Sequence, residues 1–235
     1  MLLTREALLA GELQRLVAQL DGIRALSDDE LRASLAATLA RHPPERELWV
    51  FAYGSLIWNP TFHFVERRVA RLFGYHRRFC LWTALGRGTP ERPGLMLGLD
   101  RGGSCCGVAY RIAAEAVALE TEALWRREMV TGSYRPTWVR VRDAQGTRPA
   151  ITFVINDAHE RYAQRLSDRE VAEVVAVAEG RLGACRDYLF NTLQHLTALG
   201  LRDRGLERVA AVVSELRGMP SGGSGADELG GQPRP

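Results

Sequence analysis

Short apolar segments bounded by turn residues run through the middle of this chain and limit the folds that it can adopt. The first covers residues 48–53 and ends at Gly54-Ser55, which is typical of a buried strand that runs into a tight turn. Turns are expected between most of the segments, for example at 101–103, which reads Arg-Gly-Gly. Further strands are predicted at 68–74, 77–84, 94–99, 105–112, 137–143 and 149–156. Because these strands do not alternate with helices, the pattern disfavours a doubly wound fold.

Helical periodicity is confined to one inserted segment and to the two ends of the chain. Apolar residues recur at helical spacing over 5–20, and Ser27 with Glu30 forms a capping box that predicts a helix to about Ala40. Further helices are predicted at 113–129, 169–179, 184–199 and 206–217. This order of elements predicts an α+β fold with a small mixed, barrel-like β-sheet and flanking helices.

The length of 235 residues fits one domain with extensions. We expect residues 1–45 to form a helical extension that either packs against the sheet or gates a pocket. Residues 46–217 are expected to form the main domain. Residues 218–235 are rich in Gly, Pro and Ser, and they are predicted to be a disordered tail.

Composition excludes several kinds of chemistry and partner. All 31 basic residues are Arg, so a Schiff-base lysine or a P-loop lysine is impossible. The formal net charge of +3 is too small to indicate nucleic acid, and the Arg-rich stretch 67–78 is better explained as a solvated strand face. No apolar run of the sequence reaches the roughly 20 residues of a membrane helix, so no membrane partner is expected.

The cysteines and the N-terminal residues indicate a cytoplasmic protein. The four cysteines contain no Cys-x-x-Cys pair, and they are expected to be reduced thiols. Charged residues interrupt the first apolar run, which does not have the layout of a signal peptide. None of these features predicts an oligomeric state.

The histidines and serines offer no convincing centre for metal or nucleophilic catalysis. No two of the five histidines have metal-ligand spacing. Ser55 follows a strand and a glycine, but a nucleophile elbow needs Gly-x-Ser-x-Gly, and Tyr53 and Ile57 occupy the glycine positions. We therefore expect no metal site, no cofactor and no serine nucleophile.

The turn formed by Tyr53, Gly54, Ser55 and Leu56 has the features of a ligand-binding loop. A glycine at a strand end lets a ligand approach the backbone, and successive N–H groups at a turn form an anion-binding concavity. Tyr53 and Ser55 add hydroxyl groups. A plain Gly-Ser turn explains the same residues, so the turn alone leaves both interpretations open.

Glu128 is the most informative carboxylate because it lies on an apolar helical face. It shares that face with Val117, Thr121 and Leu124, and no basic residue stands three or four positions away. A carboxylate that is partly removed from water has a raised pKa and suits general acid–base chemistry. A helix-capping role, or pairing with a distant Arg, remains an equal alternative on spacing alone.

Five sequence motifs follow one another between about residues 48 and 216. They are WVFAYGSLIWNP at 49–60, GRGTPERPG at 86–94, GVAYR at 107–111, WRREMVTGSY at 125–134 and GACRDYLF at 183–190. In this order they closely resemble the ChaC-like γ-glutamylcyclotransferases, and residues 1–45 fit the longer bacterial members. The resemblance implies a γ-glutamylcyclotransferase-like fold for the main domain. It also implies a lyase reaction on glutathione that yields 5-oxoproline and cysteinylglycine.

The resemblance also implies roles for individual residues. Glu128 matches the catalytic glutamate of the family. Tyr134 and Tyr188 match tyrosines near the substrate pocket, and Arg87 matches the arginine of an Arg-Gly-Thr-Pro turn. The substrate-holding loop corresponds to Val50, Phe51, Ala52, Tyr53, Gly54, Ser55 and Leu56.

The chemistry that the resemblance implies needs few protein groups. A γ-glutamyl amide carries its own nucleophile, because its α-amine can attack the γ-carbonyl and close a five-membered ring. An enzyme has to hold the chain bent, and such intramolecular attack can contribute about 7–11 kcal/mol toward the barrier. One carboxylate between the two nitrogens can take a proton from the attacking amine and give it to the leaving amine.

Two positions depart from the family pattern. Ala52 stands where many members have Gly, and a methyl group is tolerated there unless the backbone needs a positive φ. Cys185 stands where Asn is common, which puts one polar contact in doubt.

Two alternatives to glutathione cleavage remain. The substrate of this chain could be another γ-glutamyl amide, or the chain could be a non-enzymatic regulator linked to cation transport.

Overall fold

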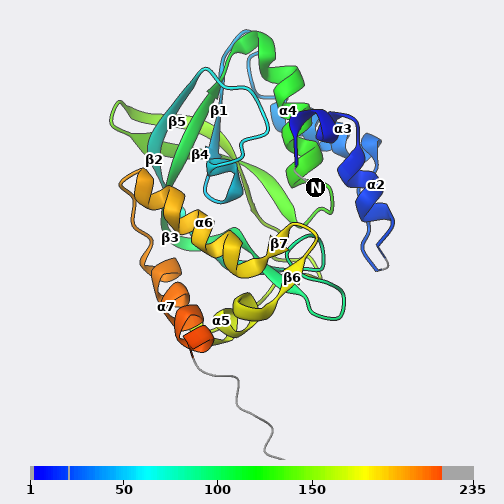
Figure 1. Ribbon diagram of the computed structural model, residues 1–235. Helices are drawn as coiled ribbons and strands as arrows, with labels where there is room; N and C mark the ends of the chain where they lie inside the picture. The colour runs from blue at the N-terminus through cyan, green and yellow to red at the C-terminus, as the bar shows by residue number, and fades with distance from the viewer. Residues whose placement is uncertain (1–2, 21, 219–235) are drawn as a thin grey trace, which may run out of the picture.

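Five strands form a closed barrel in the computed structural model, which describes residues 3–20 and 22–218 (Figure 1). The strands are β1 (Leu48–Ala52), β2 (Glu66–Thr83), β3 (Gly94–Ile112), β4 (Tyr134–Asp143) and β5 (Gly146–Ile155). Their order around the barrel is β1-β3-β2-β4-β5. Most neighbours are antiparallel, whereas β5 pairs in parallel with both β1 and β3. The predicted α+β fold with a small mixed, barrel-like sheet is therefore confirmed.

The two longest strands correct the prediction of four shorter ones. Segments 68–74 and 77–84 are parts of β2, and segments 94–99 and 105–112 are parts of β3. The predicted turn at 101–103 is wrong, because Arg101 still pairs with Tyr75 across the ladder. Gly74, Gly102 and Gly103 have positive φ values of 85°, 96° and 67°. These glycines make a β-bulge that bends both strands without ending their pairing.

Strand β1 is buried on both of its faces, which explains its unbroken apolar sequence. Alternate residues of the strand point into two different cores. Trp49 and Phe51 pack with side chains of the other strands, whereas Leu48, Val50 and Ala52 join a larger core that also contains residues of the helices. The end of β1 is thereby fixed between the barrel and the helices.

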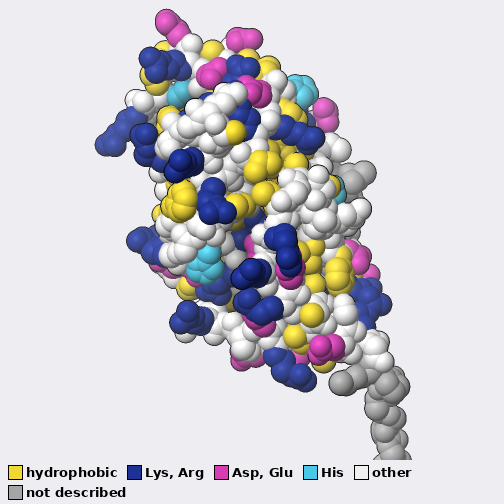
Figure 2. Space-filling model, turned by 90° about the vertical axis from the view of Figure 1, so that its left-hand side faces the viewer, with side chains coloured by type: hydrophobic (Ala, Val, Ile, Leu, Met, Phe, Trp, Pro, Cys, Tyr) yellow, Lys and Arg dark blue, Asp and Glu magenta, His cyan; other side chains and the backbone are white. Residues whose placement is uncertain are grey.

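The Arg-rich stretch of β2 lies on a mixed surface. Arg68 pairs with Glu66 and Asp143, and Arg78 pairs with Asp100. Figure 2 shows basic and acidic side chains distributed over one face of the molecule without a single continuous basic patch. Ion pairing therefore explains Arg68 and Arg78, and the absence of a nucleic-acid partner stays a prediction.

The C-terminal helices begin and end within two residues of their predicted bounds, whereas the inserted helix begins four residues later than predicted. A 3₁₀ turn, η2 (Ala114–Ala116), leads into α4 (Val117–Glu128) between β3 and β4. After β5 come α5 (Asp168–Val177), the short strands β6 (Glu179–Gly180) and β7 (Gly183–Ala184), α6 (Cys185–Ala198) and α7 (Arg204–Gly218). Helices α5, α6 and α7 pack together beside the barrel (Figure 1). None of the helices in the described residues is long and apolar enough to cross a membrane.

The N-terminal residues form α1 (Arg5–Leu9), α2 (Glu12–Ala18) and α3 (Asp28–Leu39), which contact α4 (Figure 1). The single helix predicted over 5–20 is wrong, because Gly11, with a φ of 71°, separates α1 from α2. The capping box of α3 is confirmed: the Ser27 hydroxyl accepts a hydrogen bond from the Glu30 N–H at 3.2 Å. The division at residue 45 stays a prediction, and the predicted tail beyond Gly218 lies outside the described residues.

Candidate active site

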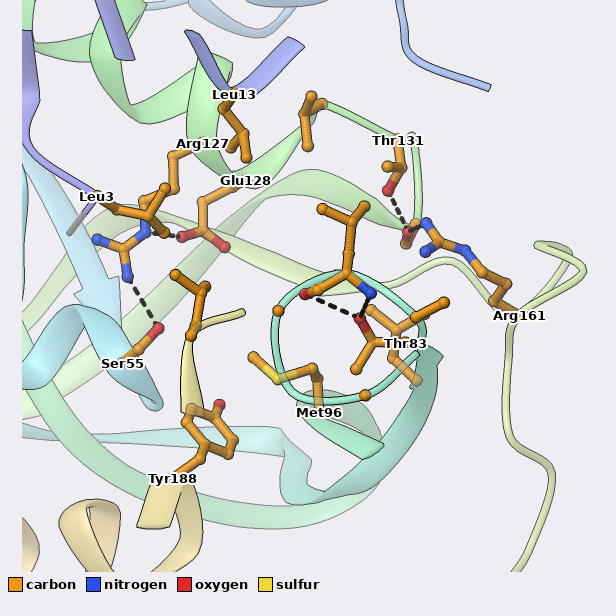
Figure 3. Close-up of a pocket in the computed structure, with 18 of the residues that line it drawn as sticks. Leu3, Leu13, Ser55, Thr83, Met96, Arg127, Glu128, Thr131, Arg161 and Tyr188 are labelled. Atoms are coloured by element: carbon orange, nitrogen blue, oxygen red, sulfur yellow. Dashed lines mark hydrogen bonds and ion pairs between the residues drawn. The ribbon is translucent and has the colours of Figure 1, made fainter. Parts of the chain in front are cut away.

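A cavity of about 580 Å³ lies beside the end of β1 and the C-terminal end of α4 (Figure 3). It brings together residues that are far apart in the sequence. The predicted site residues that line it are Tyr53, Gly54, Ser55, Leu56, Glu128, Tyr134 and Tyr188. Strand β4 and helices α4 and α6, with the turn after β1, thus supply one shared wall.

Glu128 is the last residue of α4, and its side chain is 14% exposed. Its Oε1 atom lies 3.0 Å from Nε of Arg127, which forms an ion pair with it. Burial raises the pKa of Glu128, and the charge and hydrogen bond of Arg127 oppose that rise. The predicted raised pKa is confirmed. The ion pair escaped the spacing argument because adjacent helical residues project about 100° apart and are not expected to meet.

Arg127 also fixes the loop that follows β1. Its Nη2 donates a hydrogen bond to Oγ of Ser55 at 2.8 Å, and its Nη1 donates to the Asn59 carbonyl and to Oγ1 of Thr61. Thr61 has a φ of 51°, so this contact stabilises an uncommon backbone conformation. Arg127 therefore neutralises the Glu128 carboxylate and holds Ser55 beside it.

Gly54 stands where the backbone comes close to a tyrosine. A Cβ atom built on Gly54 would lie 3.1 Å from the Tyr188 hydroxyl, which leaves little room for a side chain. Ser55 begins the 3₁₀ turn η1 (Ser55–Ile57) directly afterwards. The close neighbour of this glycine in the structure is Tyr188 of helix α6, and close approach by a ligand stays a prediction.

Three tyrosines surround the Glu128 carboxylate. Burial raises the pKa of Tyr53, Tyr134 and Tyr188, and the negative charge of Glu128 raises each of them further. Tyr53 donates its hydroxyl hydrogen to the Phe153 carbonyl at 2.8 Å. Tyr134 donates to the Leu97 carbonyl, also at 2.8 Å. The three tyrosine side chains are therefore neutral near pH 7, and they surround the ionisable carboxyl group of Glu128 with polar groups.

Four of the residues implied by the family resemblance lie outside the cavity wall. Val50, Phe51 and Ala52 are fully buried within β1. Arg87 lies behind the wall, where its Nη1 donates to the Ala184 carbonyl at 3.1 Å and its guanidinium lies 5.9 Å from the centre of the Tyr188 ring. These residues can support the wall, and direct roles in substrate binding stay predictions.

The two departures from the family pattern fit the structure. Ala52 is a strand residue, and Thr61 is the only non-glycine residue with a positive φ in the described part of the chain, so the methyl group is tolerated. Cys185 is buried, and its thiol donates to the Leu95 carbonyl at 3.1 Å. A weak S–H donor therefore satisfies a buried acceptor at this position.

Sequence reasoning left open whether the N-terminal helices pack against the sheet or gate a pocket, and it missed which of their residues line the cavity. Four leucines from the segment 3–20 line the cavity, namely Leu3, Leu13, Leu16 and Leu20. Three of them belong to the apolar stripe seen in the sequence, which did not reveal what the stripe faces. Figure 3 shows Leu3 and Leu13 near the Arg127 and Glu128 pair, where they supply an apolar cover.

Sequence reasoning also missed Arg127, which is adjacent to the predicted glutamate, and Arg161, which lies in the segment after β5. Neither residue stands at a spacing that predicts contact with the site. In residues 3–20 and 22–218, no group of three or more His, Cys, Asp or Glu side chains has an arrangement that could hold a metal ion.

Comparison with known proteins gives a consistent set of relatives. Residues 48–216 match the family described as ChaC-like protein. The glutathione-specific γ-glutamylcyclotransferase of Escherichia coli is 40% identical over 216 residues, which cover 92% of this chain and 94% of that protein. The human glutathione-specific γ-glutamylcyclotransferase 1 is 30% identical and covers 73% of this chain and 79% of its own length.

A solved structure supports the same fold. The crystal structure described as a γ-glutamylcyclotransferase specific to glutathione from yeast matches 72% of this chain and 96% of its own, with a TM-score of 0.66 and 23% identity. At this identity the likeness concerns the fold.

Proposed function

Because this chain belongs to the ChaC-like family, we propose that it is a γ-glutamylcyclotransferase that cleaves glutathione into 5-oxoproline and cysteinylglycine. The relatives from Escherichia coli and human are named as glutathione-specific enzymes of this type. These names favour an enzyme over a non-enzymatic regulator linked to cation transport. The observation that carries the proposal is the single, mostly buried carboxylate of Glu128 among neutral tyrosines on a cavity wall.

In the proposed reaction, the α-amine nitrogen of the glutamyl group bonds to the γ-carbonyl carbon, and the bond from that carbon to the cysteine nitrogen breaks. The α-ammonium group gives up two protons, and the leaving amine gains two, so no proton is gained or lost overall. Glu128 accepts each proton and delivers it to the leaving nitrogen. The raised pKa supports this role, because a carboxyl group that titrates closer to neutral pH both accepts and releases protons readily.

We propose that the turn at Gly54-Ser55 binds negative charge on the substrate and that the side chain of Arg127 keeps this turn in position. Backbone N–H groups of the turn can hold the oxyanion that develops on the γ-carbonyl, or they can hold the α-carboxylate. In both cases Arg127 keeps the Ser55 side chain next to Glu128.

We further propose that residues 46–217 form the catalytic domain. A cytoplasmic location also stays a prediction, and it is supported by the four free cysteines.

The pH dependence of kcat/KM is expected to report the burial of Glu128. Burial favours the neutral acid, so the pKa is raised, and the basic form is lost as the pH falls through this raised value. The acid limb should therefore lie above the value of about 4.3 that a solvated glutamate gives. Initial rates with glutathione from about pH 4 to about pH 8 measure this limb directly. A limb at the solvated value would show that another, exposed group supplies the base.

The substrate is tested by incubating the purified protein with glutathione, γ-Glu-Cys and γ-Glu-Ala in parallel and following 5-oxoproline by mass spectrometry. We expect glutathione to have the highest kcat/KM of the three. Turnover of γ-Glu-Ala without turnover of glutathione would instead assign the cavity to other γ-glutamyl amides. If none of the three gave 5-oxoproline, the proposed reaction would be wrong.

A further inference from the structure

Arg161 presents an unpaired positive charge to the cavity. It lies in the segment between β5 and α5 and is partly buried on the cavity wall. Within the described residues its guanidinium makes one hydrogen bond, from Nη2 to Oγ of Ser133 at 2.8 Å, and it has no ion-pair partner. Burial lowers the pKa of Arg161, which reflects the cost of a charge that is held away from water.

The position of Arg161 is set by contacts with the loop that follows Glu128. The Arg161 N–H donates to Nδ1 of His159 at 3.1 Å, and Nε2 of the same ring donates to the Thr131 carbonyl at 3.1 Å. Ser133, which accepts from the guanidinium, also hydrogen-bonds to the hydroxyl of Thr131. Burial and the nearby Arg161 lower the pKa of His159, so the ring is neutral near pH 7 and Arg161 carries the charge.

The other charged groups of the cavity do not serve Arg161 as partners. Arg127 and Glu128 neutralise each other, and Arg127 has three further acceptors. Glu91 and Arg181 also line the cavity, but both are exposed to solvent. A partly buried guanidinium is stabilised by a carboxylate, with which it can form two parallel hydrogen bonds. The missing partner of Arg161 is therefore best supplied by a bound anion.

We propose that Arg161 binds the glycyl carboxylate of glutathione, an inference that rests on the proposed function. The α-carboxylate is attached to the carbon that bears the attacking amine, so it has to stay near Glu128 and the turn at Gly54-Ser55. The glycyl carboxylate lies at the far end of the cysteinylglycine unit. Two extended residues span up to about 7 Å, so in an extended substrate this carboxylate lies up to about 7 Å from the γ-carbonyl that is attacked. Figure 3 shows Arg161 on the side of the cavity away from Arg127 and Ser55.

This assignment makes Arg161 a specificity-determining residue. A substrate whose leaving group ends in a carboxylate at the right distance completes the charge pair, whereas a γ-glutamyl amine leaves the guanidinium unpaired. Loss of a hydrogen-bonded charge pair of this kind is expected to change kcat/KM about 10- to 100-fold.

The test compares glutathione with its glycyl ethyl ester, which lacks the negative charge, on three proteins. The wild type should prefer glutathione by about 10- to 100-fold in kcat/KM. Arg161→Met should lose this preference while it turns over the ester at nearly the wild-type rate, and Arg161→Lys should regain part of it. Arg181→Met, which removes an exposed arginine of the same cavity, should keep the full preference.

Other outcomes would overturn the assignment. If Arg161→Met slowed both substrates equally and kept the preference, Arg161 would support the shape of the cavity without binding the glycyl carboxylate. If the preference disappeared in Arg181→Met instead, the exposed Arg181 would be the residue that binds this carboxylate. Calorimetric titration of both compounds into proteins that also carry Glu128→Gln measures the carboxylate contact without turnover. Equal binding of acid and ester by Glu128→Gln with Arg161 intact would refute the contact, whereas a preference in binding there, with no 5-oxoproline from the wild type, would refute only the proposed reaction.

Discussion

Replacing Glu128 by Gln is expected to reduce kcat for glutathione at least about 100-fold, which is the lower end of the usual contribution of general acid–base catalysis. The amide keeps the size and hydrogen-bonding capacity of the side chain but cannot exchange protons with the two substrate nitrogens. Arg127 loses its carboxylate partner, yet it keeps its bonds to Ser55, Asn59 and Thr61. The fold is therefore retained, and the loss is seen as a lower kcat in steady-state assays.

Glu122→Gln is the matched control for this experiment. Glu122 lies on the same helix, is about half exposed and pairs with Arg126 four positions away. Its substitution should leave kcat within about a factor of two, because an exposed pair of this type contributes little to stability. Retention of more than about a tenth of the wild-type rate by Glu128→Gln would contradict the proton-shuttle role.

Replacing Arg127 by Met is expected to affect both stability and pH dependence. The substitution leaves a buried carboxylate unpaired and removes the donor from Ser55, Asn59 and Thr61, so the free energy of unfolding should fall by about 3 kcal/mol. Arg127 favours the ionised form of Glu128, so its removal raises the pKa of Glu128 further. The acid limb of kcat/KM should then move to higher pH, and less enzyme is active at pH 7.

Urea unfolding and the pH profile of kcat/KM measure these two effects separately. Arg126→Met is the control, because Arg126 pairs with Glu122 and Asp28, both about half exposed, and has no contact with the Glu128 carboxylate. It should cost less than about 1 kcal/mol and leave the acid limb in place. A loss of stability in Arg127→Met without any movement of the acid limb of kcat/KM would show that the ion pair with Arg127 does not shift the pKa of Glu128.

Local sequence patterns predicted most of the secondary structure. The capping box at Ser27 and Glu30 and the helical ends near Glu128 and Ala198 are set by contacts within a few residues, so sequence spacing detects them. Glycines were less reliable. Gly102 and Gly103 suggested a turn, but here the positive φ values of Gly74, Gly102 and Gly103 form a bulge within a continuous ladder. Whether a glycine ends a strand depends on the partner strand, which the local sequence does not specify.

The candidate site was only partly predictable for a similar reason. An apolar helical face identified Glu128, and the motif after β1 identified the turn at Gly54-Ser55. The cavity also includes Leu13 from the N-terminal helices and Arg161 from the segment after β5. These side chains meet only through tertiary packing, and no periodicity in the sequence indicates the element against which they pack. Arg127 was overlooked because neighbours in a helix are not expected to form a pair.

The most direct test of the proposed reaction is to incubate the wild-type protein with glutathione in ¹⁸O-labelled water and to analyse the products by mass spectrometry. Intramolecular attack consumes no water, so the expected result is unlabelled 5-oxoproline and cysteinylglycine in equal amounts. Release of ¹⁸O-labelled glutamate with cysteinylglycine would mean that water, and not the α-amine, attacks the γ-carbonyl. That result would contradict cyclisation as the function of this cavity.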